Sequence, residues 1–560
     1  MSDRKYYMRR YGLTGGMDTS TNPFVMNDAS FLYVKNMNHE ENGSLSKDGG
    51  FSKFKIATTS ATGDDMLFDY VNLLGVHTTL KISNGILYKA DSGDNWVQVA
   101  AGATTAGNRV SAVNHLDRAY FCNGVNNLKY TSGSTVTDVA TDNGSANVRG
   151  KYLEVLQNFI YVGHITTVHK RNEVVESLPG THVFYNVNIE GHNTYTTTDR
   201  KITVDGQITG LKAYQGLLFI FTEDAIWYYN PDTKEVKRLA DTGCVAHETI
   251  KEIDGVLYWA NRNGVYRFSG EGMPTLVSLP ITNWGGKSLW SLVDGSNWGK
   301  LCAGVHEGKY CLWLGDLTGA LPGDRLPIIS CENLEIENSS AGGYGIWYAG
   351  NNSIDGGGNE GWIFSDPPEQ TSSEPATPSK DVVVYFDTYR GVWGFYDNHP
   401  VSIWASVVDG NGDKQLLFGS DQDGQTYIRD KSYTHDGAAT DAVIRTKYFD
   451  FDNPENEKTL NDLFATYRPE GEENIYVDVS LAINGSDAYV KYLDDSSSTR
   501  LPLGGDVLGA YQFERVSLGG VRARTASYEF RNRSGGVSFT LLGFCQEFTY
   551  LQPNMNYTTG

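Results

Sequence analysis

The sequence lacks the features that mark membrane, secreted and metal-binding proteins. No stretch approaches the roughly 18 consecutive apolar residues of a membrane span. No apolar run follows the basic residues Arg4 and Lys5, so we expect no secretory signal. The cysteines form no Cys-x-x-Cys pair, which favours buried thiols in a reducing cytosol over disulfides or a zinc site. They are Cys122, Cys244, Cys302, Cys311, Cys331 and Cys545.

Positive charge is scarce. The chain has 46 Lys and Arg residues against 67 Asp and Glu, which gives a net charge of −21. Binding to the outside of a nucleic acid duplex depends on clusters of Lys and Arg, so this composition argues against it. A negative wall could instead line a channel through which DNA passes without sticking, and the alternative is that the charge only keeps a large protein soluble.

The motifs of common catalytic sites are missing too. There is no Walker loop, dinucleotide fingerprint or Gly-x-Ser-x-Gly elbow. Because 67 acidic residues would always supply some carboxylate pair, none is selected, and we predict no enzyme activity, no catalytic, cofactor-binding or metal-ligating residue, and no cofactor. The histidines include no His-x-x-x-His, so isolated histidines are favoured over zinc ligands, for example at His164, His169, His182 and His192.

What the sequence has in abundance is turn and strand residues. It contains 62 Gly and 34 Tyr, and 12% of its residues are aromatic. Aromatic side chains favour pleated surfaces and Gly supplies positive-φ turn positions, so we predict an all-β protein with little helix. At 560 residues, two or more domains are expected.

One phrase repeats along the chain: an apolar strand, a turn that often contains Gly, and a second strand rich in aromatics. Its clearest copies start near Gly216 and Gly255, and weaker ones surround Gly85 and Gly124. The step is 39 residues from Gly85 to Gly124 and again from Gly216 to Gly255. A period of about 40 residues is typical of one four-stranded propeller blade. We therefore predict a β-propeller of about six blades, with five or seven as alternatives.

Changes in the pattern give predicted domain boundaries. Residues 1–55 have little periodicity and are predicted to form an extended N-terminal arm, followed by the propeller at 56–440. A flexible insertion is expected near 344–380, where Gly, Pro, Ser and Glu prevail. Longer alternating strands predict a C-terminal β-sandwich over 441–552, and residues 553–560 form a polar tail.

Some turns resemble functional motifs. Residues 420–427 and 91–96 are degenerate versions of the Asp-box of sialidases, which is a structural turn between blade strands even there. Residues 409–413 and 421–423 place carboxylates at alternate positions, as a calcium loop does. The distant bidentate Glu of an EF-hand is missing, so ordinary hairpin chemistry is favoured.

The N-terminal segment carries a family resemblance. It contains Gly15-Gly16-Met17-Asp18, then Pro23-Phe24-Val25-Met26, then Val34-Lys35-Asn36-Met37, then Asn42-Gly43-Ser44-Leu45-Ser46-Lys47, and ends on Gly50-Phe51. This order resembles the opening of the tail propeller proteins of double-stranded DNA phages, which include tail nozzle (tail tubular B), hub and stabilisation proteins. Asp48 and Gly49 are a departure, because the family has fewer residues between the basic residue and the final Gly-Phe.

The resemblance implies a structural protein of the virion. It would form a homohexameric ring around the channel through which the genome leaves, bind portal, adaptor and other tail proteins, and meet DNA only in passage. It would be located in the virion tail after assembly in the host cytoplasm. The alternatives are a carbohydrate-binding or glycosidase propeller of a tail spike, which would need a carboxylate pair, and a propeller scaffold unrelated to phages.

Overall fold

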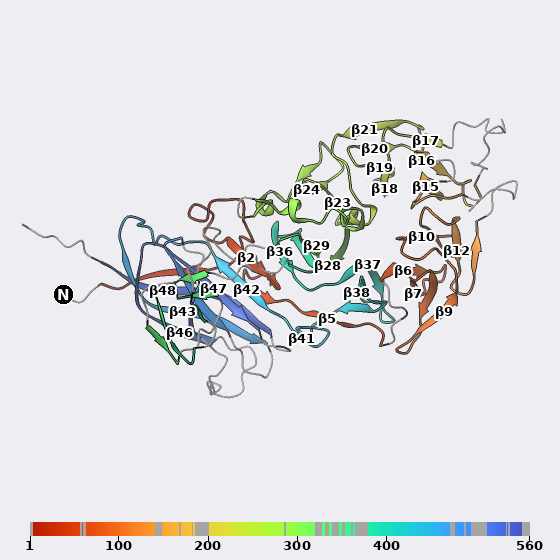
Figure 1. The fold of residues 1–560 in the computed structure, drawn as a ribbon. Helices are drawn as coiled ribbons and strands as arrows, with labels where there is room; N and C mark the ends of the chain where they lie inside the picture. Colours follow the sequence, from red (N-terminus) through yellow and green to blue (C-terminus); the bar gives the residue numbers. More distant parts are fainter. Residues whose placement is uncertain are drawn as a thin grey trace, which may run out of the picture.

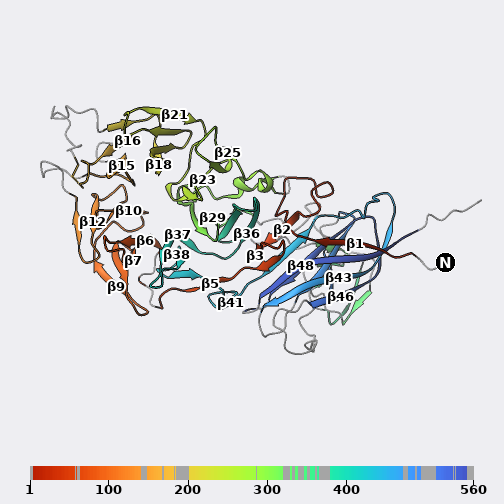
Figure 2. The same ribbon diagram turned by 180° about the vertical axis from the view of Figure 1, so that it is seen from behind.

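The computed structural model shows an elongated all-β protein with a ring of sheets at one end and long strands at the other (Figures 1 and 2). The described residues are 4–56, 59, 63–139, 148–166, 170–181, 183–184, 201–284, 287–319, 328–330, 335–338, 346–349, 353–359, 362–364, 379–470, 477–485, 489–493, 512–533, 535 and 538–551. Among them, helix is confined to four short 3-10 segments: η2 (His247–Thr249), η3 (Leu279–Ile281), η4 (Leu289–Leu292) and η5 (Trp298–Lys300). No helix in these ranges is long and apolar enough to cross a membrane.

Five antiparallel four-stranded sheets follow one another along the chain. The first contains β6 (Asp64–Val71), β7 (His77–Ser83), β8 (Ile86–Ala90) and β9 (Trp96–Ala100). The second contains β10 (Ser111–His115), β11 (Arg118–Cys122), β12 (Lys129–Thr131) and β13 (Val136–Asp138). The third contains β14 (Tyr152–Leu156), β15 (Phe159–Ile165), β16 (Lys170–Glu176) and β17 (Lys201–Thr203).

The fourth and fifth sheets correspond to the clearest repeats in the sequence. The fourth contains β18 (Ile208–Tyr214), β19 (Leu217–Thr222), β20 (Ile226–Tyr229) and β21 (Val236–Ala240). The fifth contains β22 (Lys251–Ile253), β23 (Val256–Asn261), β24 (Gly264–Phe268) and β25 (Thr275–Leu276). Their first hairpins turn at Gln215-Gly216 and Asp254-Gly255, where all four residues have positive φ. This is the type I′ geometry that matches strand twist, and it explains why the 39-residue step corresponds to one sheet.

The sixth sheet contains β28 (Cys302–His306), β29 (Lys309–Gly315), β35 (Val382–Asp387) and β36 (Val392–Tyr396). The seventh contains β37 (Val401–Val408), β38 (Lys414–Ser420) and β39 (Thr426–Arg429), and its fourth strand is β5 (Gly50–Lys53) from the N-terminal segment. The short strands β40 (Thr434–His435) and β41 (Ala438–Ala439) extend this sheet beyond β5.

The seven sheets form a closed ring. Strand β6 contacts β10, β10 contacts β14, and β14 contacts β18. The short helix η2 contacts β18, β23 of the fifth sheet and β28, and β22 of the fifth sheet contacts β28 as well. Strand β28 then contacts β37, which returns to β6. This is a β-propeller, as predicted. Its seven sheets exceed the favoured number of six blades but agree with the alternative of seven. The last strand of the seventh sheet lies at 50–53, before the predicted start of the propeller.

The sixth blade continues without a break into the C-terminal half. Strand β2 (Phe31–Lys35) pairs with β36 on one side and with β42 (Ala442–Thr446) on the other. Strands β47 (Ala526–Asn532), β44 (Asp478–Ile483) and β45 (Val490–Leu493) complete a sheet of nine strands. One hydrogen-bonded sheet therefore spans the propeller and the C-terminal half.

A second sheet packs on the C-terminal part of the first. It contains β3 (Met37–His39), β4 (Leu45–Lys47), β48 (Ser538–Tyr550), β43 (Lys458–Glu470) and β46 (Gln512–Ala523), and β1 (Tyr6–Tyr11) pairs with β48. Tyr528 of the first sheet donates to Gln546 Oε1 of the second at 2.9 Å, and its ring lies 5.3 Å from that of Phe544. The C-terminal unit predicted at 441–552 is therefore incomplete. The N-terminal segment adds β2 to the first sheet and β1, β3 and β4 to the second.

The N-terminal segment is not an arm that projects from the protein. Its strands β1 to β5 all pair within the chain, and β5 runs between the two halves in Figure 1. The prediction of an extended arm over 1–55 was wrong in this respect, because strands of three to six residues are too short to show a period. Strands β1, β2, β4 and β5 each pair with a strand hundreds of residues away, and β3 pairs with β4.

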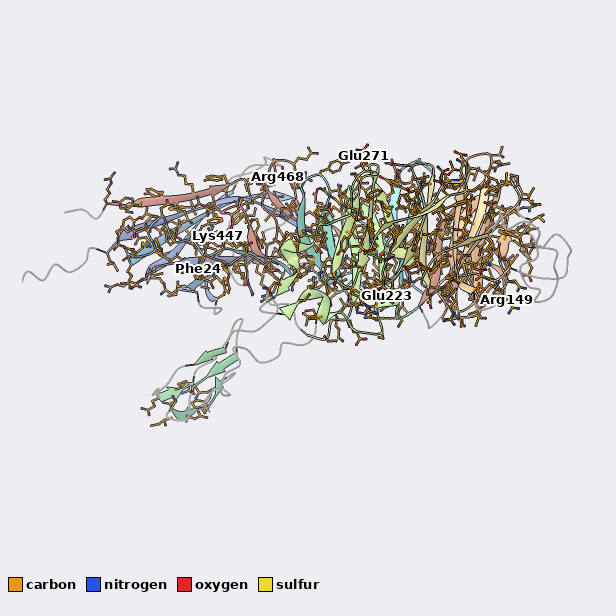
Figure 3. All side chains as sticks on the ribbon, turned by 90° about the horizontal axis from the view of Figure 1, so that it is seen from above. Phe24, Arg149, Glu223, Glu271, Lys447 and Arg468 are labelled. Carbon is orange, nitrogen blue, oxygen red and sulfur yellow. The ribbon has the colours of Figure 1, made fainter. Side chains whose placement is uncertain are left out.

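The insertion is larger than predicted. The chain leaves β29 at Gly315 and enters β35 at Val382, and short parallel strands lie between them. They are β30 (Ile328–Ser330), β31 (Glu335–Glu337), β32 (Ile346–Tyr348), β33 (Ile354–Gly357) and β34 (Trp362–Ile363), which lie away from the propeller disc in Figure 3. The Pro-rich part of the predicted loop, 365–378, is outside the described residues. A separate two-stranded pair, β26 (Asn283–Trp284) and β27 (Lys287–Ser288), precedes β28.

Closure of the propeller by β5 can be tested at Phe51. This buried side chain packs against the rings of Phe418 and Tyr427 at 5.0 and 5.1 Å. We expect Phe51→Ala to lower the free energy of unfolding by about 3–5 kcal/mol, measured by denaturant titration, because it removes an aromatic anchor of the closing strand. Leu74→Ala, at a residue 88% exposed, is the control and should change stability by no more than about 0.5 kcal/mol. Equal effects would contradict the closing role of β5.

Candidate functional site

The first strands of the blades surround a central channel of about 520 Å³. Asp69, Glu154, Lys212, Glu248 and Lys251 contribute to its wall. Lys212 Nζ lies 3.6 Å from Glu154 Oε2, and Lys251 Nζ lies 3.4 Å from Glu248 Oε2. The lysines of the wall therefore have carboxylate partners inside the channel.

A second, much smaller hollow adjoins the channel. Its volume is only about 20 Å³, which is room for about one water molecule, and it shares Ser111 and His247 with the channel. The Arg109 guanidinium lies beside this hollow and donates to the carbonyls of Lys300, at 2.6 Å, and Ser402.

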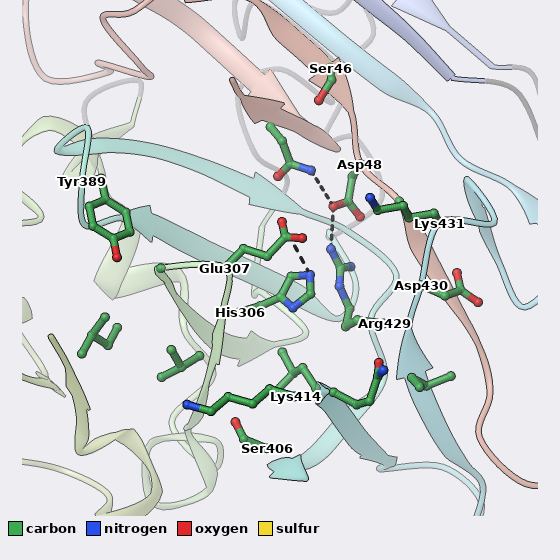
Figure 4. A pocket seen from close by; sticks show the side chains of 18 of the residues that line it. Ser46, Asp48, His306, Glu307, Tyr389, Ser406, Lys414, Arg429, Asp430 and Lys431 are labelled. Carbon is green, nitrogen blue, oxygen red and sulfur yellow. Dashed lines mark hydrogen bonds and ion pairs between the residues drawn. The ribbon is translucent and has the colours of Figure 1, made fainter. Parts of the chain in front are cut away.

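A larger groove lies between one face of the propeller and the C-terminal half. Its volume is about 1180 Å³, and Figure 4 shows polar side chains from several elements around it. Charges of both signs line it, among them Asp254, Glu307, Lys414, Lys431 and Arg468. Tyr389, 72% exposed, lies at the groove as well. This arrangement suits a polar ligand better than an apolar one.

Much of the charge in the groove wall is already compensated. Glu307 Oε2 lies 3.7 Å from Lys309 Nζ and 3.9 Å from His306 Nε2. Burial lowers the pKa of His306 to about 4, so this imidazole is neutral at pH 7 and Lys309 is the cationic partner. The groove presents hydrogen-bonding groups without a strong net field of either sign.

One buried cluster beside the groove has the composition of a metal centre. Potential ligand atoms of Asp48, His399 and His435 lie within 4.8 Å of one another. However, Arg429 occupies the cluster: Nη2 lies 2.5 Å from Asp48 Oδ1 and Nη1 lies 2.6 Å from His399 Nε2. His399 Nδ1 lies 2.8 Å from the Asp397 carbonyl, so both nitrogens of this ring have partners.

The electrostatics of the cluster fit a guanidinium rather than a metal cation. Burial opposes ionisation of Asp48, but the Arg429 charge outweighs it and holds the pKa of Asp48 well below its usual range. Burial lowers the pKa of His435 to about 4 and that of His399 well below 6.5, so both rings are neutral. A second cation here would be repelled by Arg429. We interpret the cluster as an arginine-centred network that fixes β39 to the N-terminal segment.

The two Asp-box-like segments are structural turns. Residues 420–427 join β38 to β39, and Ser420 Oγ accepts from the backbone N–H groups of Gln422 and Asp423 at 3.1 and 3.2 Å. Residues 91–96 join β8 to β9, and Asp91 Oδ1 accepts from the N–H of Gly93 at 2.9 Å. Their position between blade strands is the one predicted.

The calcium-like spacing also has a local explanation. Asp409 Oδ1 accepts from the N–H groups of Asn411 and Asp413, both at 2.9 Å, in the turn between β37 and β38. These hydrogen bonds lower the pKa of Asp409. The carboxylate is used by the turn itself, as hairpin chemistry predicts.

Other predicted features are placed as follows. Five of the cysteines are buried free thiols: Cys122, Cys244, Cys302, Cys311 and Cys545. His164 is buried, with Nδ1 2.8 Å from the Ile208 carbonyl. Cys331, His169, His182 and His192 lie outside the described residues.

Sequence reasoning missed the Arg429 network and the groove beside it. Asp48, His399, Arg429 and His435 come from four separate segments, so no spacing in the sequence could join them. The one available signal was Asp48 itself, which was noted only as a departure from the family pattern.

No protein-family model matches the chain, and no curated protein matches it. Among solved structures it is similar to the computationally designed Ika8 protein, with 9% identity over 68% of this chain and 100% of that chain and a TM-score of 0.35. It is also similar to virginiamycin B lyase from Staphylococcus aureus (10% identity, 66% and 94% coverage, TM-score 0.36) and to YCF48 bound to D1 peptide (10%, 71% and 99%, 0.37). Similarity this weak identifies neither a family nor an activity.

The role of Arg429 can be tested by substitution. We expect Arg429→Ala to lower the free energy of unfolding by about 3–5 kcal/mol, because it leaves Asp48 buried without its cationic partner. Arg429→Ala combined with Asp48→Asn should recover part of this loss, since the unpaired charge is removed. If the double variant is less stable by the sum of the two single effects, the pair is not coupled and the interpretation fails.

The partly buried His247 predicts a pH dependence of stability. Burial lowers the pKa of His247 from 6.5 to about 4. Between these values the unfolded chain binds a proton that the folded chain does not, so stability should fall as the pH drops from 6.5 toward 4 and be unaffected by this group above 6.5. His247→Asn should remove up to about 3 kcal/mol of this dependence.

The measurement is denaturant unfolding of both proteins at several pH values. The comparison with wild type is needed because burial raises the pKa of Asp381 to about 7, which makes stability rise as the pH falls through that value. Parallel pH profiles for wild type and variant would show that His247 does not contribute.

Proposed function

We propose that this chain is a structural protein of a bacteriophage tail, of the nozzle or hub type. In this proposal, copies of the chain form a ring around the DNA ejection channel and contact adaptor, portal and neighbouring tail proteins in the virion. The proposal starts from the resemblance of residues 15–51 to the tail propeller proteins. No enzyme activity and no cofactor belong to it.

The observation that supports it most is the place of that same segment in the fold. Residues 15–51 contain β2, which joins the propeller to the C-terminal half, and β3 and β4, which complete the second C-terminal sheet. Strand β5, which closes the propeller, begins where the segment ends. The residues that carry the resemblance are thus the ones that make propeller and C-terminal half one continuous structure.

Continuous backbone pairing of this kind suits a structural protein that has to keep its shape under force. Between the two halves, β2 hydrogen-bonds to both β36 and β42, so rotation of one half against the other would break backbone hydrogen bonds. The two facing C-terminal sheets, which we interpret as the predicted β-sandwich, then hold a fixed position relative to the propeller. A ring built from such subunits keeps a constant lumen.

The path of DNA in this proposal lies between subunits. The channel of one propeller has a volume of only about 520 Å³, so the genome would pass through a lumen enclosed by several copies. The excess of 67 acidic over 46 basic residues would keep DNA from sticking to the wall. The insertion between β29 and β35, which projects from the disc, is available for contact with another tail protein.

Electron microscopy of the purified protein, combined with native mass spectrometry, tests the proposal. We expect a closed ring with a central pore, and an assembly mass equal to a whole number of chains, six in the family that the chain resembles. A closed ring requires a head-to-tail interface between copies. A chain that stays monomeric at all concentrations and is absent from virus particles would refute the proposal.

The second candidate function is a carbohydrate-binding or carbohydrate-cleaving propeller of a tail spike. The groove of about 1180 Å³ with the exposed Tyr389 favours it, because aromatic rings and mixed polar groups bind sugars. The same microscopy separates the two functions. A trimer without a pore would favour the spike, and a glycan array would then be the next measurement.

A further inference from the structure

Lys81 and Asp64 form a charged pair that is buried inside the protein, at the seam where the first blade meets the seventh. Lys81 lies on β7 and Asp64 is the first residue of β6. Both side chains are 0% exposed, and Lys81 Nζ lies 3.4 Å from each of the two Asp64 carboxylate oxygens. The amine therefore faces the carboxyl group as a whole rather than one oxygen.

The surroundings of the pair exclude water. The ring of Trp96 lies 4.6 Å from Lys81 Nζ, and the Gly424 carbonyl accepts from Nζ at 2.7 Å. The hydroxyl of Thr426 lies 3.1 Å from Lys81 Nζ and 3.3 Å from Asp64 Oδ2, so it touches both partners. Trp96, Gly424 and Thr426 belong to the two Asp-box-like turns, which meet at this point.

The pair is a poor ion pair. Some lysine–carboxylate pairs of this protein are shorter, for example Lys447–Asp28 at 2.7 Å and Lys129–Asp138 at 2.6 Å, whereas pairs of similar length such as Lys212–Glu154 are partly exposed and Lys81–Asp64 is fully buried. Among the described residues, Asp64 Oδ1 has no hydrogen-bond partner. Burying two charges without good geometry is costly. Burial raises the pKa of Asp64 to about 6 and lowers that of Lys81, so both groups are shifted toward their neutral forms.

We propose that Lys81 and Asp64 condense to an intramolecular amide bond between Nζ and Cγ. One proton passes from the ammonium group to Asp64 Oδ2 by way of the Thr426 hydroxyl, which leaves a neutral amine and a carboxylic acid. The nitrogen lone pair then attacks Cγ and forms the N–C bond. A second proton moves from nitrogen to the leaving oxygen, the Cγ–O bond breaks, and one water molecule departs.

The reaction needs no oxidant, cofactor or second protein. The fold holds Lys81 Nζ 3.4 Å from both oxygens of the Asp64 carboxyl group, which replaces a bimolecular step by a unimolecular one. Burial of both side chains opposes hydrolysis of the product. The product replaces two buried charges by one neutral amide, whose N–H can keep the hydrogen bond to the Gly424 carbonyl. The bond would fasten β6 to β7 beside the seam at which the propeller closes.

Intact mass spectrometry of the denatured protein is the first test. The proposal predicts a mass below that of the unmodified chain by one water molecule. Trypsin should fail to cleave after Lys81, and residues 56–89 should appear as one peptide that is lighter by one water. Lys212–Glu154, 3.6 Å apart with side chains 29% and 15% exposed, is the internal control and should remain unmodified.

Two variants distinguish the amide bond between Lys81 and Asp64 from a loss of water at another place in the chain. Lys81→Arg keeps the charge but should show the full mass, with cleavage after residue 81. Asp64→Asn should still form the bond, now with loss of one ammonia molecule instead of water. Full mass and cleavage after Lys81 in the wild-type protein would overturn the proposal even if a variant fails to fold. The outcome does not depend on the proposed tail function.

Discussion

The structure depends on backbone pairing between the N-terminal segment and strands that lie hundreds of residues later. Strand β5 supplies the last strand of the seventh blade, and β2 lies between the sixth blade and the C-terminal half. Neither pairing can form until most of the chain has been made, and the entropy of closing such long loops has to be offset by burial and hydrogen bonds. Phe51 and the Arg429 network supply that burial at β5.

The charged groups inside the protein are concentrated at these junctions rather than in an open cleft. Arg429, Asp48 and His399 fix β39 to the N-terminal segment, and Lys81 with Asp64 lies at the seam between the first and seventh blades. Buried charges tolerate few alternative arrangements, because any slip leaves a charge without its partner. They therefore penalise strand pairings that would separate these partners.

The same architecture limits what the protein can do with its cavities. The central channel holds paired charges, while the groove beside the C-terminal half is larger, open and polar. The walls of the groove come from the propeller, from β3 and β4 and from β43, so a ligand or partner that binds there would contact both halves of the molecule.

The sequence by itself determined the local structure. Asn-Gly and Asp-Gly turns and alternating apolar residues dictate hairpins wherever they occur, so the propeller and the turn roles of Ser420, Asp91 and Asp409 could be predicted. Tertiary structure decided the rest: the number of blades, the pairing of the strands in residues 1–55, and the contact between Asp48, His399, Arg429 and His435. Those features depend on contacts between distant segments. Strands of three to six residues are too short for their sequence pattern to show which strand they pair with.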